Sequence, residues 1–226
     1  LFGHYGPKYR VRLNVTYRMN RALCQFPSLT WYEGELQPAP ENAESKLQLK
    51  NEISDNPLDR LIDPNRPVTL GILRHLGQHQ ECEPEADVIS RIAGRLITHF
   101  AVKPEHIAII SPHRAQNNLI RARLLELVQG KARELPLIDT VERVQGAERE
   151  VIIFGFTTSD RDQVTSSFLN NPNRFNVVIT RARKKLIVIG SSAFFQAIPN
   201  QEKDLVDNAC FKKFLKHCKS SCVSLS

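Results

Sequence analysis

Three continuously apolar runs constrain the fold of this chain more than any other feature. The runs are Ile107–Ile110, Val151–Phe156 and Leu186–Ile189. A strand with one solvated face alternates apolar and polar residues, whereas a strand buried on both faces is apolar at nearly every position. We therefore expect these runs to be strands of a sheet whose two faces are both covered.

Segments with helical periodicity separate the apolar runs. One begins at Pro84 and continues to Phe100, and another begins at Arg114. Two further strands are predicted, at Val68–Leu73 and Leu135–Val141. Strands that alternate with helices predict an α/β fold, with a mainly parallel sheet and helices on both faces.

Ligands of such sheets bind at the carboxyl ends of the strands. The functional residues are therefore expected in three loops, at residues 111–116, 140–148 and 157–183. We expect one domain over residues 1–200, followed by a C-terminal helix and tail over 201–226.

The N-terminal part has fewer regular signals. Val11 and Leu13 predict a short strand, and the Phe26-Pro27 pair predicts a turn. Residues 33–67 are expected to be a mostly irregular excursion, with one short helix over Ala43–Leu49. Prolines interrupt this excursion, at Pro38, Pro40, Pro57, Pro64 and Pro67.

The charge balance favours an anionic partner. The chain has 31 basic and 24 acidic residues and a net charge of +7, which suits nucleic acid but leaves other partners open. No apolar run is long enough to cross a bilayer, so no membrane partner is expected. The start of the chain has no Met and no secretory signal, so we expect the chain to be part of a longer protein.

Five scattered cysteines do not form a disulfide framework, which fits an intracellular protein of the cytoplasm or nucleus. Four metal-binding side chains lie near the C-terminus: Cys210, His217, Cys218 and Cys222. Their spacing matches no zinc pattern. No residue of the chain is therefore assigned as a metal ligand.

Arginines stand at two informative positions. Arg181 and Arg183 precede the apolar run that begins at Leu186, and Arg18 follows Tyr17. A guanidinium is a planar, permanently charged group that holds phosphate or carboxylate in two parallel hydrogen bonds. From these residues alone, surface arginines exposed to solvent remain an equally good interpretation.

Several stretches, taken together and in order, resemble the second RecA-like domain of superfamily-1 helicases, in the branch of the nonsense-mediated-decay RNA helicase and its DNA-helicase relatives. The resemblance covers residues 1 to 192. Residues 139–148 are similar to motif V and residues 168–183 to motif VI. The other matching stretches are Leu13–Asn20, Phe26–Ser28, Tyr32–Leu36 and Ile107–Gln116.

The sequence departs from the family pattern at four positions. Thr16 stands where the family commonly has Gln, and Asn20 where it has His. In motif V, Glu142 replaces Asp and Val144 replaces Phe. The longer carboxylate of Glu142 is expected to weaken the usual pairing within motif V.

The resemblance implies a RecA-like P-loop NTPase fold and an ATP-dependent helicase. Arg18 and Arg181 match the two arginine fingers that reach the γ-phosphate, and Tyr17 matches the residue that stacks on adenine. Glu148 matches the carboxylate that binds the ribose hydroxyls, beside Gly146, where a glycine lets the backbone approach the nucleotide.

The resemblance also places Arg183 near the nucleotide, although a salt bridge within the domain is an equally good reading. Ser111, Gln116 and Thr140 lie where the family contacts single-stranded DNA or RNA. Small polar groups of this kind hold phosphates without reading bases. For Ser111, a cap of the loop before Pro112 is an equal alternative. His113 lies in the same loop, where the family often has Tyr; an ordinary loop histidine is preferred to a stacking role.

No Gly-x-x-x-x-Gly-Lys-Ser/Thr pattern occurs in the sequence. In the family, the first RecA-like domain supplies this P-loop and most of the Mg²⁺ site. The chain is therefore expected to carry half of an ATP site and to be inactive alone. The alternatives are a non-catalytic nucleic-acid-binding or scaffold module derived from a helicase, and a small nucleotide kinase, which would need its own P-loop.

Overall fold

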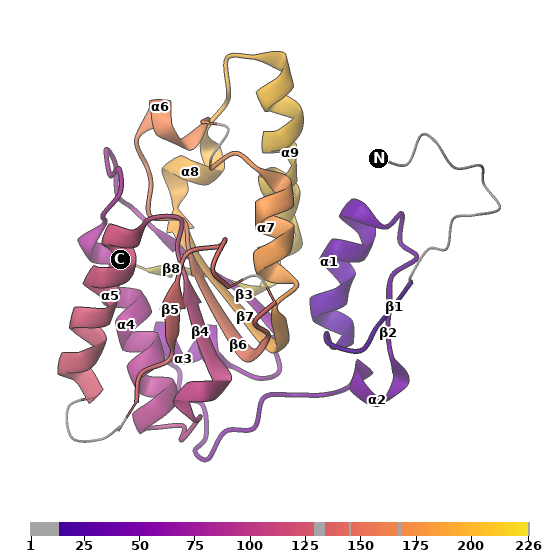
Figure 1. The fold of residues 1–226 in the computed structure, drawn as a ribbon, viewed down its shortest axis with the longest axis vertical. Coiled ribbons are helices and arrows are strands. Elements are labelled where there is room, and N and C mark those ends of the chain that lie inside the picture. Colours follow the sequence, from indigo (N-terminus) through magenta and orange to yellow (C-terminus); the bar gives the residue numbers. More distant parts are fainter. Residues whose placement is uncertain (1–13, 129–133, 145, 167–168, 226) are drawn as a thin grey trace.

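Five of the predicted strands lie side by side in one six-stranded sheet, whose sixth strand, at Cys222–Leu225, was not predicted (Figure 1). In this computed structural model, which describes residues 14–128, 134–144, 146–166 and 169–225, the strand order is β5-β4-β6-β7-β3-β8. Every neighbouring pair is parallel. The strands are β3 (Val68–Leu73), β4 (Ile107–Ile110), β5 (Leu137–Asp139), β6 (Arg149–Gly155), β7 (Ala182–Ser191) and β8 (Cys222–Leu225).

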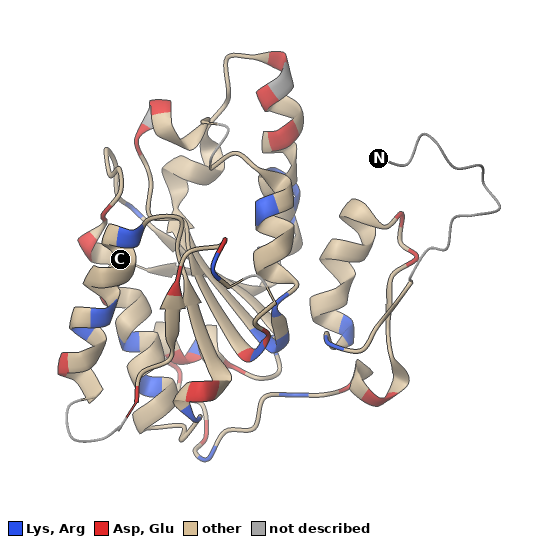
Figure 2. Cartoon of the chain, in the orientation of Figure 1, with Lys and Arg blue, Asp and Glu red and all other residues tan. Residues whose placement is uncertain are grey.

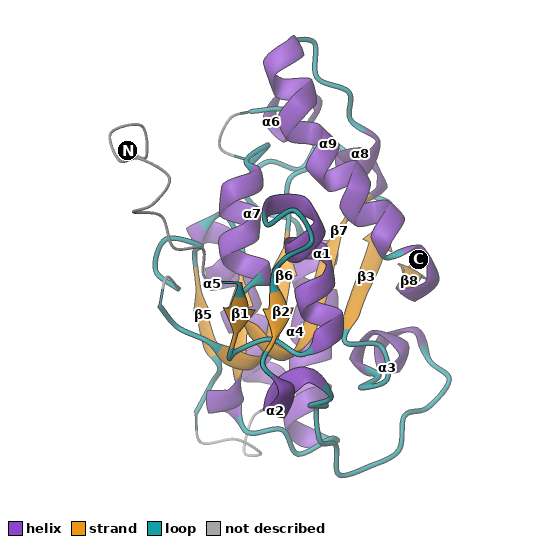
Figure 3. Cartoon of the chain, turned by 90° about the vertical axis from the view of Figure 1, so that its right-hand side faces the viewer, coloured by secondary structure: helices purple, strands orange, loops and turns teal. Residues whose placement is uncertain are grey.

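Helices cover both faces of this sheet, as predicted (Figures 1 and 3). One face carries α3 (Pro57–Ile62), α4 (Glu83–Thr98) and α5 (Arg114–Val128). The other carries α1 (Arg21–Trp31), α7 (Pro172–Ile179) and α9 (Glu202–His217).

Strand β4 shows why its sequence is apolar throughout. Ile107 and Ile109 pack into the core under α4 and α5. Ala108 and Ile110 point the other way, into the core under α1 and α7. Because successive side chains of a strand point to opposite faces, a sheet covered on both sides needs apolar residues at every position.

A small lobe precedes the main sheet. It consists of α1, a two-stranded parallel sheet of β1 (Val15–Thr16) and β2 (Gln37–Pro38), and α2 (Pro40–Ala43). The remaining short elements are the 3₁₀ turn η2 (Pro104–His106), α6 (Arg161–Val164), α8 (Ser192–Gln196) and the 3₁₀ turn η3 (Lys219–Ser221).

Two local predictions in the N-terminal part were wrong. The Phe26-Pro27 pair lies inside α1 and not in a turn. The helix survives Pro27 because Asn20 caps its start, accepting a hydrogen bond from Leu23 N at 3.0 Å. The buried ring of Phe26 also packs edge-to-face on Phe214, with centroids 5.0 Å apart.

The helix predicted over Ala43–Leu49 does not form, because this segment runs extended between α2 and α3 (Figure 1). The extended chain carries Leu47 into the core on the α3–α4 face. The strand predicted at Val11 and Leu13 lies outside the described residues.

The strand ends also differ in part from prediction. Strand β5 is shorter than Leu135–Val141, and β7 begins at Ala182, ahead of the apolar run. The C-terminal segment packs on the same body, since Phe214 of α9 is fully buried and β8 pairs with β3. Among the described helices, none is long and apolar enough to cross a membrane.

Candidate functional site

The predicted site residues lie at two opposite edges of the sheet. We call the side where β6 and β7 begin the amino edge, and the side where β3, β4 and β6 end the carboxyl edge. Ser111 and Thr140 directly follow β4 and β5, at the carboxyl edge. Glu148 and Arg181 directly precede β6 and β7, at the amino edge.

The expectation that all functional loops lie at the carboxyl edge was therefore wrong. Glu148 and Arg181 lie at the amino edge because each directly precedes a strand, and Arg183 lies there because it is the second residue of β7. The segment 140–148 joins the two edges. Strands β5 and β6 are both parallel to β4, so the chain between them must run back from the carboxyl edge to the amino edge. Val141 and Val144 of this connecting segment are buried.

The amino edge gathers arginines around one carboxylate; Figure 2 shows basic and acidic residues together where β6 and β7 begin. The Nε of Arg18 donates to Glu148 Oε2, and its Nη1 donates to the carbonyl of Thr180 at 3.0 Å. Arg183 Nη1 lies 3.9 Å from Glu148 Oε1. Arg149 Nη1 donates to the Glu148 carbonyl at 2.8 Å. Residues more than a hundred positions apart in the sequence therefore share one site.

The end of α7 positions this site. Asn171 caps the start of the helix, accepting from Arg174 N at 3.0 Å, and Pro172 occupies the first turn. At the other end, Arg181 N donates to the carbonyl of Val178 at 3.0 Å. The Arg181 carbonyl then accepts from Arg149 N at 3.2 Å. The backbone thus places Arg181 beside the start of β6.

The charges at the amino edge act on one another. The hydrogen bond from Arg18 holds the pKa of Glu148 below its usual value, with further contributions from the charges of Arg18, Arg183 and Arg181. Burial, followed by the charge of Arg18, lowers the pKa of Arg181. Because several guanidinium groups surround one carboxylate, the edge has an excess of positive charge that suits an anion such as phosphate.

Arg181 and Arg183 are held differently. The Nε of Arg181 donates to the carbonyl of Val177 at 3.0 Å, and its side chain is half-buried. Arg183 is 47% exposed, and its contact with Glu148 favours the predicted salt bridge within the domain. The roles of Arg181 and Arg183 toward a nucleotide stay predictions.

Tyr17 and Gly146 have the accessibility that their predicted roles need. The side chain of Tyr17 is 71% exposed, and its carbonyl is fixed by Asn42 Nδ2 at 2.8 Å. Gly146 has a φ of +88°, which favours glycine, and a Cβ added there would meet nothing within 4 Å. The backbone at Gly146 is therefore open to a ligand.

The three residues predicted to contact nucleic acid are buried at the carboxyl edge. Ser111 Oγ donates to Asn117 Oδ1 at 2.9 Å, which agrees with the alternative of a loop cap. The Gln116 amide makes two hydrogen bonds to the backbone of Cys82, at 2.8 and 3.1 Å. Thr140 accepts Arg143 N and Val144 N through its carbonyl. In this structure, the Ser111 and Gln116 side chains support the loop surface from within.

The departures from the family pattern have local explanations. Asn20 caps α1 and also donates to the carbonyl of Lys184 at 3.1 Å, which fastens the helix to β7. Val144 is buried in the core. Glu142 lies 3.2 Å from Arg174, so its longer carboxylate pairs with motif VI. Thr16 Oγ1 accepts Arg18 N at 3.3 Å.

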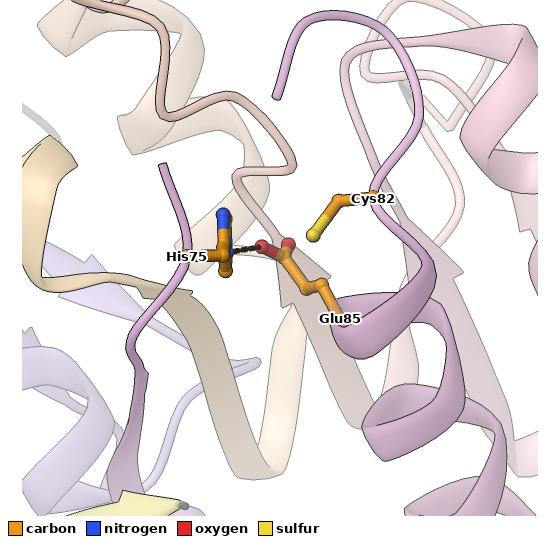
Figure 4. Close-up of side chains that lie close together, drawn as sticks. All are labelled: His75, Cys82 and Glu85. Atoms are coloured by element: carbon orange, nitrogen blue, oxygen red, sulfur yellow. Dashed lines mark ion pairs between the residues drawn. The ribbon is translucent and has the colours of Figure 1, made fainter. Parts of the chain in front are cut away.

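Sequence reasoning missed a group at the carboxyl edge, His75, Cys82 and Glu85, whose side chains face one another (Figure 4). Only the fold brings His75 to the other two. Cys82 and Glu85 stand three positions apart at a helix start, and this spacing was the available signal. Within the described ranges, the C-terminal cysteines and His217 form no comparable metal-binding group.

Comparison with known proteins agrees with the motif pattern. The model of the family described as AAA domain matches residues 2–193. The chain belongs to this family. As the motifs predicted, it is a superfamily-1 helicase region with an α/β, RecA-like fold.

Several relatives of this AAA domain are named as helicases. It is 34% identical over 197 residues to the DNA polymerase alpha-associated DNA helicase A of Schizosaccharomyces pombe. The aligned region covers 83% of this chain and 29% of that relative. It is 32% identical over 191 residues to the Regulator of nonsense transcripts 1 homolog of Arabidopsis thaliana, covering 80% and 14%. It is 27% identical over 231 residues to the DNA replication ATP-dependent helicase/nuclease DNA2 of Bos taurus, covering 87% and 21%. The chain thus spans less than a third of each of these relatives.

Proposed function

We propose that this AAA domain is the C-terminal motor domain of an ATP-dependent DNA or RNA helicase. It supplies arginine fingers to an ATP site and part of the surface that holds a single strand. The arginine cluster at the amino edge carries the proposal, because a phosphate-sized anion is what several converging guanidinium groups suit best. The relatives that are named as helicases support the same function.

In this proposal the amino edge faces the nucleotide. Arg18 and Arg181 stabilise the negative charge that develops on the transferred phosphoryl group, a contribution of roughly a thousand-fold or more in rate. Tyr17 stacks on the adenine, Glu148 binds the ribose hydroxyls beside Gly146, and Arg183 holds Glu148 in place.

The rest of the ATP site comes from the first RecA-like domain of the same protein. The sequence of this chain contains no P-loop pattern. In this proposal, the first RecA-like domain therefore supplies the P-loop and most of the Mg²⁺ site. ATP draws the two domains together and hydrolysis separates them, which moves the enzyme along one strand. The surface over Ser111, Gln116 and Thr140 holds that strand. The free state of all five cysteines supports an intracellular location, in the nucleus or cytoplasm.

Arg181→Ala tests the proposal in a protein that contains both this chain and a P-loop domain. We expect kcat for ATP hydrolysis to fall roughly a thousand-fold, with single-strand binding in the absence of ATP unchanged. The matched control is Arg143→Ala, an arginine 62% exposed on the 140–148 segment, which should leave kcat nearly unchanged. Normal turnover in Arg181→Ala would remove its assigned role. Magnesium-dependent ATP hydrolysis by the isolated chain would refute the half-site.

A further inference from the structure

A buried group of metal-binding side chains lies at the carboxyl edge, on the opposite side of the sheet from the arginine cluster. His75 follows the end of β3, Cys82 is the residue before α4, and Glu85 is in the first turn of that helix. All three residues are buried. One ligand atom from each lies within 4.8 Å of the others (Figure 4).

Two of these atoms are buried without a hydrogen bond. His75 Nε2 and Glu85 Oε2 face each other across 3.3 Å, an ion pair when the imidazole is protonated (dashed line in Figure 4), and neither atom has a hydrogen-bond partner. Their side chains are 5% and 0% exposed. Buried polar atoms without a hydrogen bond are unfavourable, so the arrangement favours a ligand that both atoms can bind.

We propose that His75, Cys82 and Glu85 bind a zinc ion. Ligand atoms about 2.0–2.3 Å from a tetrahedral zinc are roughly 3.3–3.8 Å apart. The 3.3 Å separation of His75 Nε2 and Glu85 Oε2 already has this value. The Cys82 sulfur lies within 4.8 Å of both atoms, so it needs only a small movement toward them to complete the zinc site. Three protein ligands leave the fourth zinc position for a water molecule.

The ligand types favour zinc over the hard cations. Thiolate and imidazole suit zinc and other soft or borderline metals, whereas magnesium and calcium prefer oxygen ligands. A cysteine binds zinc as the thiolate, so the thiol proton of Cys82 passes to solvent as the metal binds.

Neighbouring groups already orient all three ligands. His75 Nδ1 is hydrogen-bonded to Ser159 Oγ at 2.9 Å, which leaves Nε2 directed at Glu85. Glu85 Oε1 accepts Thr157 N at 2.7 Å, which leaves Oε2 for the metal. The Gln116 amide clamps the backbone of Cys82. Such outer partners are typical of metal sites, where they fix the ring and carboxylate orientations.

The zinc would tie three parts of the carboxyl edge together. It joins the end of β3 to the start of α4, and the Gln116 clamp extends this link to the first turn of α5. The loop that follows β4 lies at the same place, so the ion would support the surface proposed to hold a single strand. The zinc site does not depend on the proposed strand binding, because it is inferred from the positions of His75, Cys82 and Glu85 alone.

Cobalt titration of the metal-stripped chain tests the proposal. Cobalt(II) replaces zinc in such sites, and a thiolate ligand gives it a charge-transfer band in the near ultraviolet. We expect one Co²⁺ per chain, with this band, and displacement by one equivalent of Zn²⁺. Cys82→Ser should lose the band, and His75→Gln and Glu85→Gln should lose stoichiometric binding. Cys222→Ser, which removes an exposed cysteine away from the group, should bind as the wild type does.

Thermal unfolding with and without Zn²⁺ gives a second readout, since a ligand that binds only the folded state raises its Tm. The wild type and Cys222→Ser should gain the same Tm shift, and Glu85→Gln, which keeps the side-chain size, should gain none. If Cys82→Ser fails to fold, Glu85→Gln carries the comparison. A wild-type titration without a thiolate band would overturn the proposal. So would a band that survives in Cys82→Ser or disappears in Cys222→Ser.

Discussion

Replacing Glu148 with Gln tests the electrostatics of the amino edge in the isolated chain. The substitution keeps the size of the side chain and removes one negative charge. Arg18 donates to this carboxylate and Arg183 lies 3.9 Å from it. After the change, Arg18 still donates to the Thr180 carbonyl, so the guanidinium keeps one anchor and the fold is expected to persist.

The magnitude follows from how exposed the groups are. The side chain of Glu148 is 41% exposed and that of Arg18 is 33% exposed. Exposed ion pairs contribute about 0.2–1 kcal/mol each, and two charges 4 Å apart in water attract by about 1 kcal/mol. Glu148→Gln should therefore lower the free energy of unfolding by about 1 kcal/mol. For a chain of this length, that is a decrease in Tm of about 2–4 °C.

The effect should depend on pH and salt. Because the folded pKa of Glu148 is lowered, its contribution is full above the unfolded pKa and is lost as the pH falls through the folded pKa. The Gln variant has no such group, so the two Tm values should converge in acid. They should also converge in 1 M salt, where the screening length is about 3 Å.

Thermal unfolding followed by circular dichroism, from pH 7 down to pH 3 and at low and high salt, measures these differences. Glu142→Gln is the matched control on the same segment, where one exposed pair with Arg174 is lost, and a smaller Tm change is expected. A Tm decrease in Glu148→Gln that is the same in acid and in 1 M salt would show that the reasoning is wrong, because the effect would not be electrostatic.

Two further predictions concern the body of the sheet and its helices. Arg95→Met removes the cation that binds the fully buried carboxylate of Asp59 at 2.6 and 2.8 Å. In urea, the free energy of unfolding should fall by about 3 kcal/mol, near the lower end for buried ion pairs because Arg95 is one-third exposed. A fall of less than about 1 kcal/mol would contradict this prediction. Gly155→Ala places a Cβ 2.6 Å from Glu85 Oε1 and from Ile89 Cδ1. The overcrowding should lower the free energy of unfolding in urea by about 1–3 kcal/mol. Gly94 lies inside α4, where an added Cβ would have no neighbouring atom closer than 3.6 Å, so Gly94→Ala should raise the free energy of unfolding by about 0.5–1 kcal/mol. If both substitutions changed this free energy in the same direction, the packing argument would be refuted.

Strands that are apolar throughout were predictable from the sequence, and strands with polar ends were not. Strand β4 has the predicted bounds, Ile107–Ile110. Strand β7 begins four residues before its apolar run, because its start pairs with β6 through backbone hydrogen bonds that any residue makes. Lys185 in that start is fully buried, with its Nζ bound to the carbonyls of Asp63 and Arg66. A lysine gives no sequence signal for such a position.

The candidate site was predictable only in part. The motif pattern selected Arg18, Glu148 and Arg181, and the fold brings their side chains to one edge. Residue spacing did not reveal which edge that is, because this depends on whether a residue precedes or follows its strand. The group around His75 was missed, since that residue meets Cys82 and Glu85 only through the path of the loop after β3.

The position of β3 within the sheet has a consequence for how the chain is made. Both hydrogen-bonding neighbours of β3, β7 and β8, come from the last part of the sequence. At about 5–20 residues per second, the roughly one hundred residues between Leu73 and the core of β7 take on the order of 5–20 seconds to synthesise. During that interval β3 has two open edges, which are templates for pairing with other chains. A nascent chain of this domain therefore needs protection at β3 until its C-terminal strands emerge, and a product that ends before Cys222 keeps one of those edges open permanently.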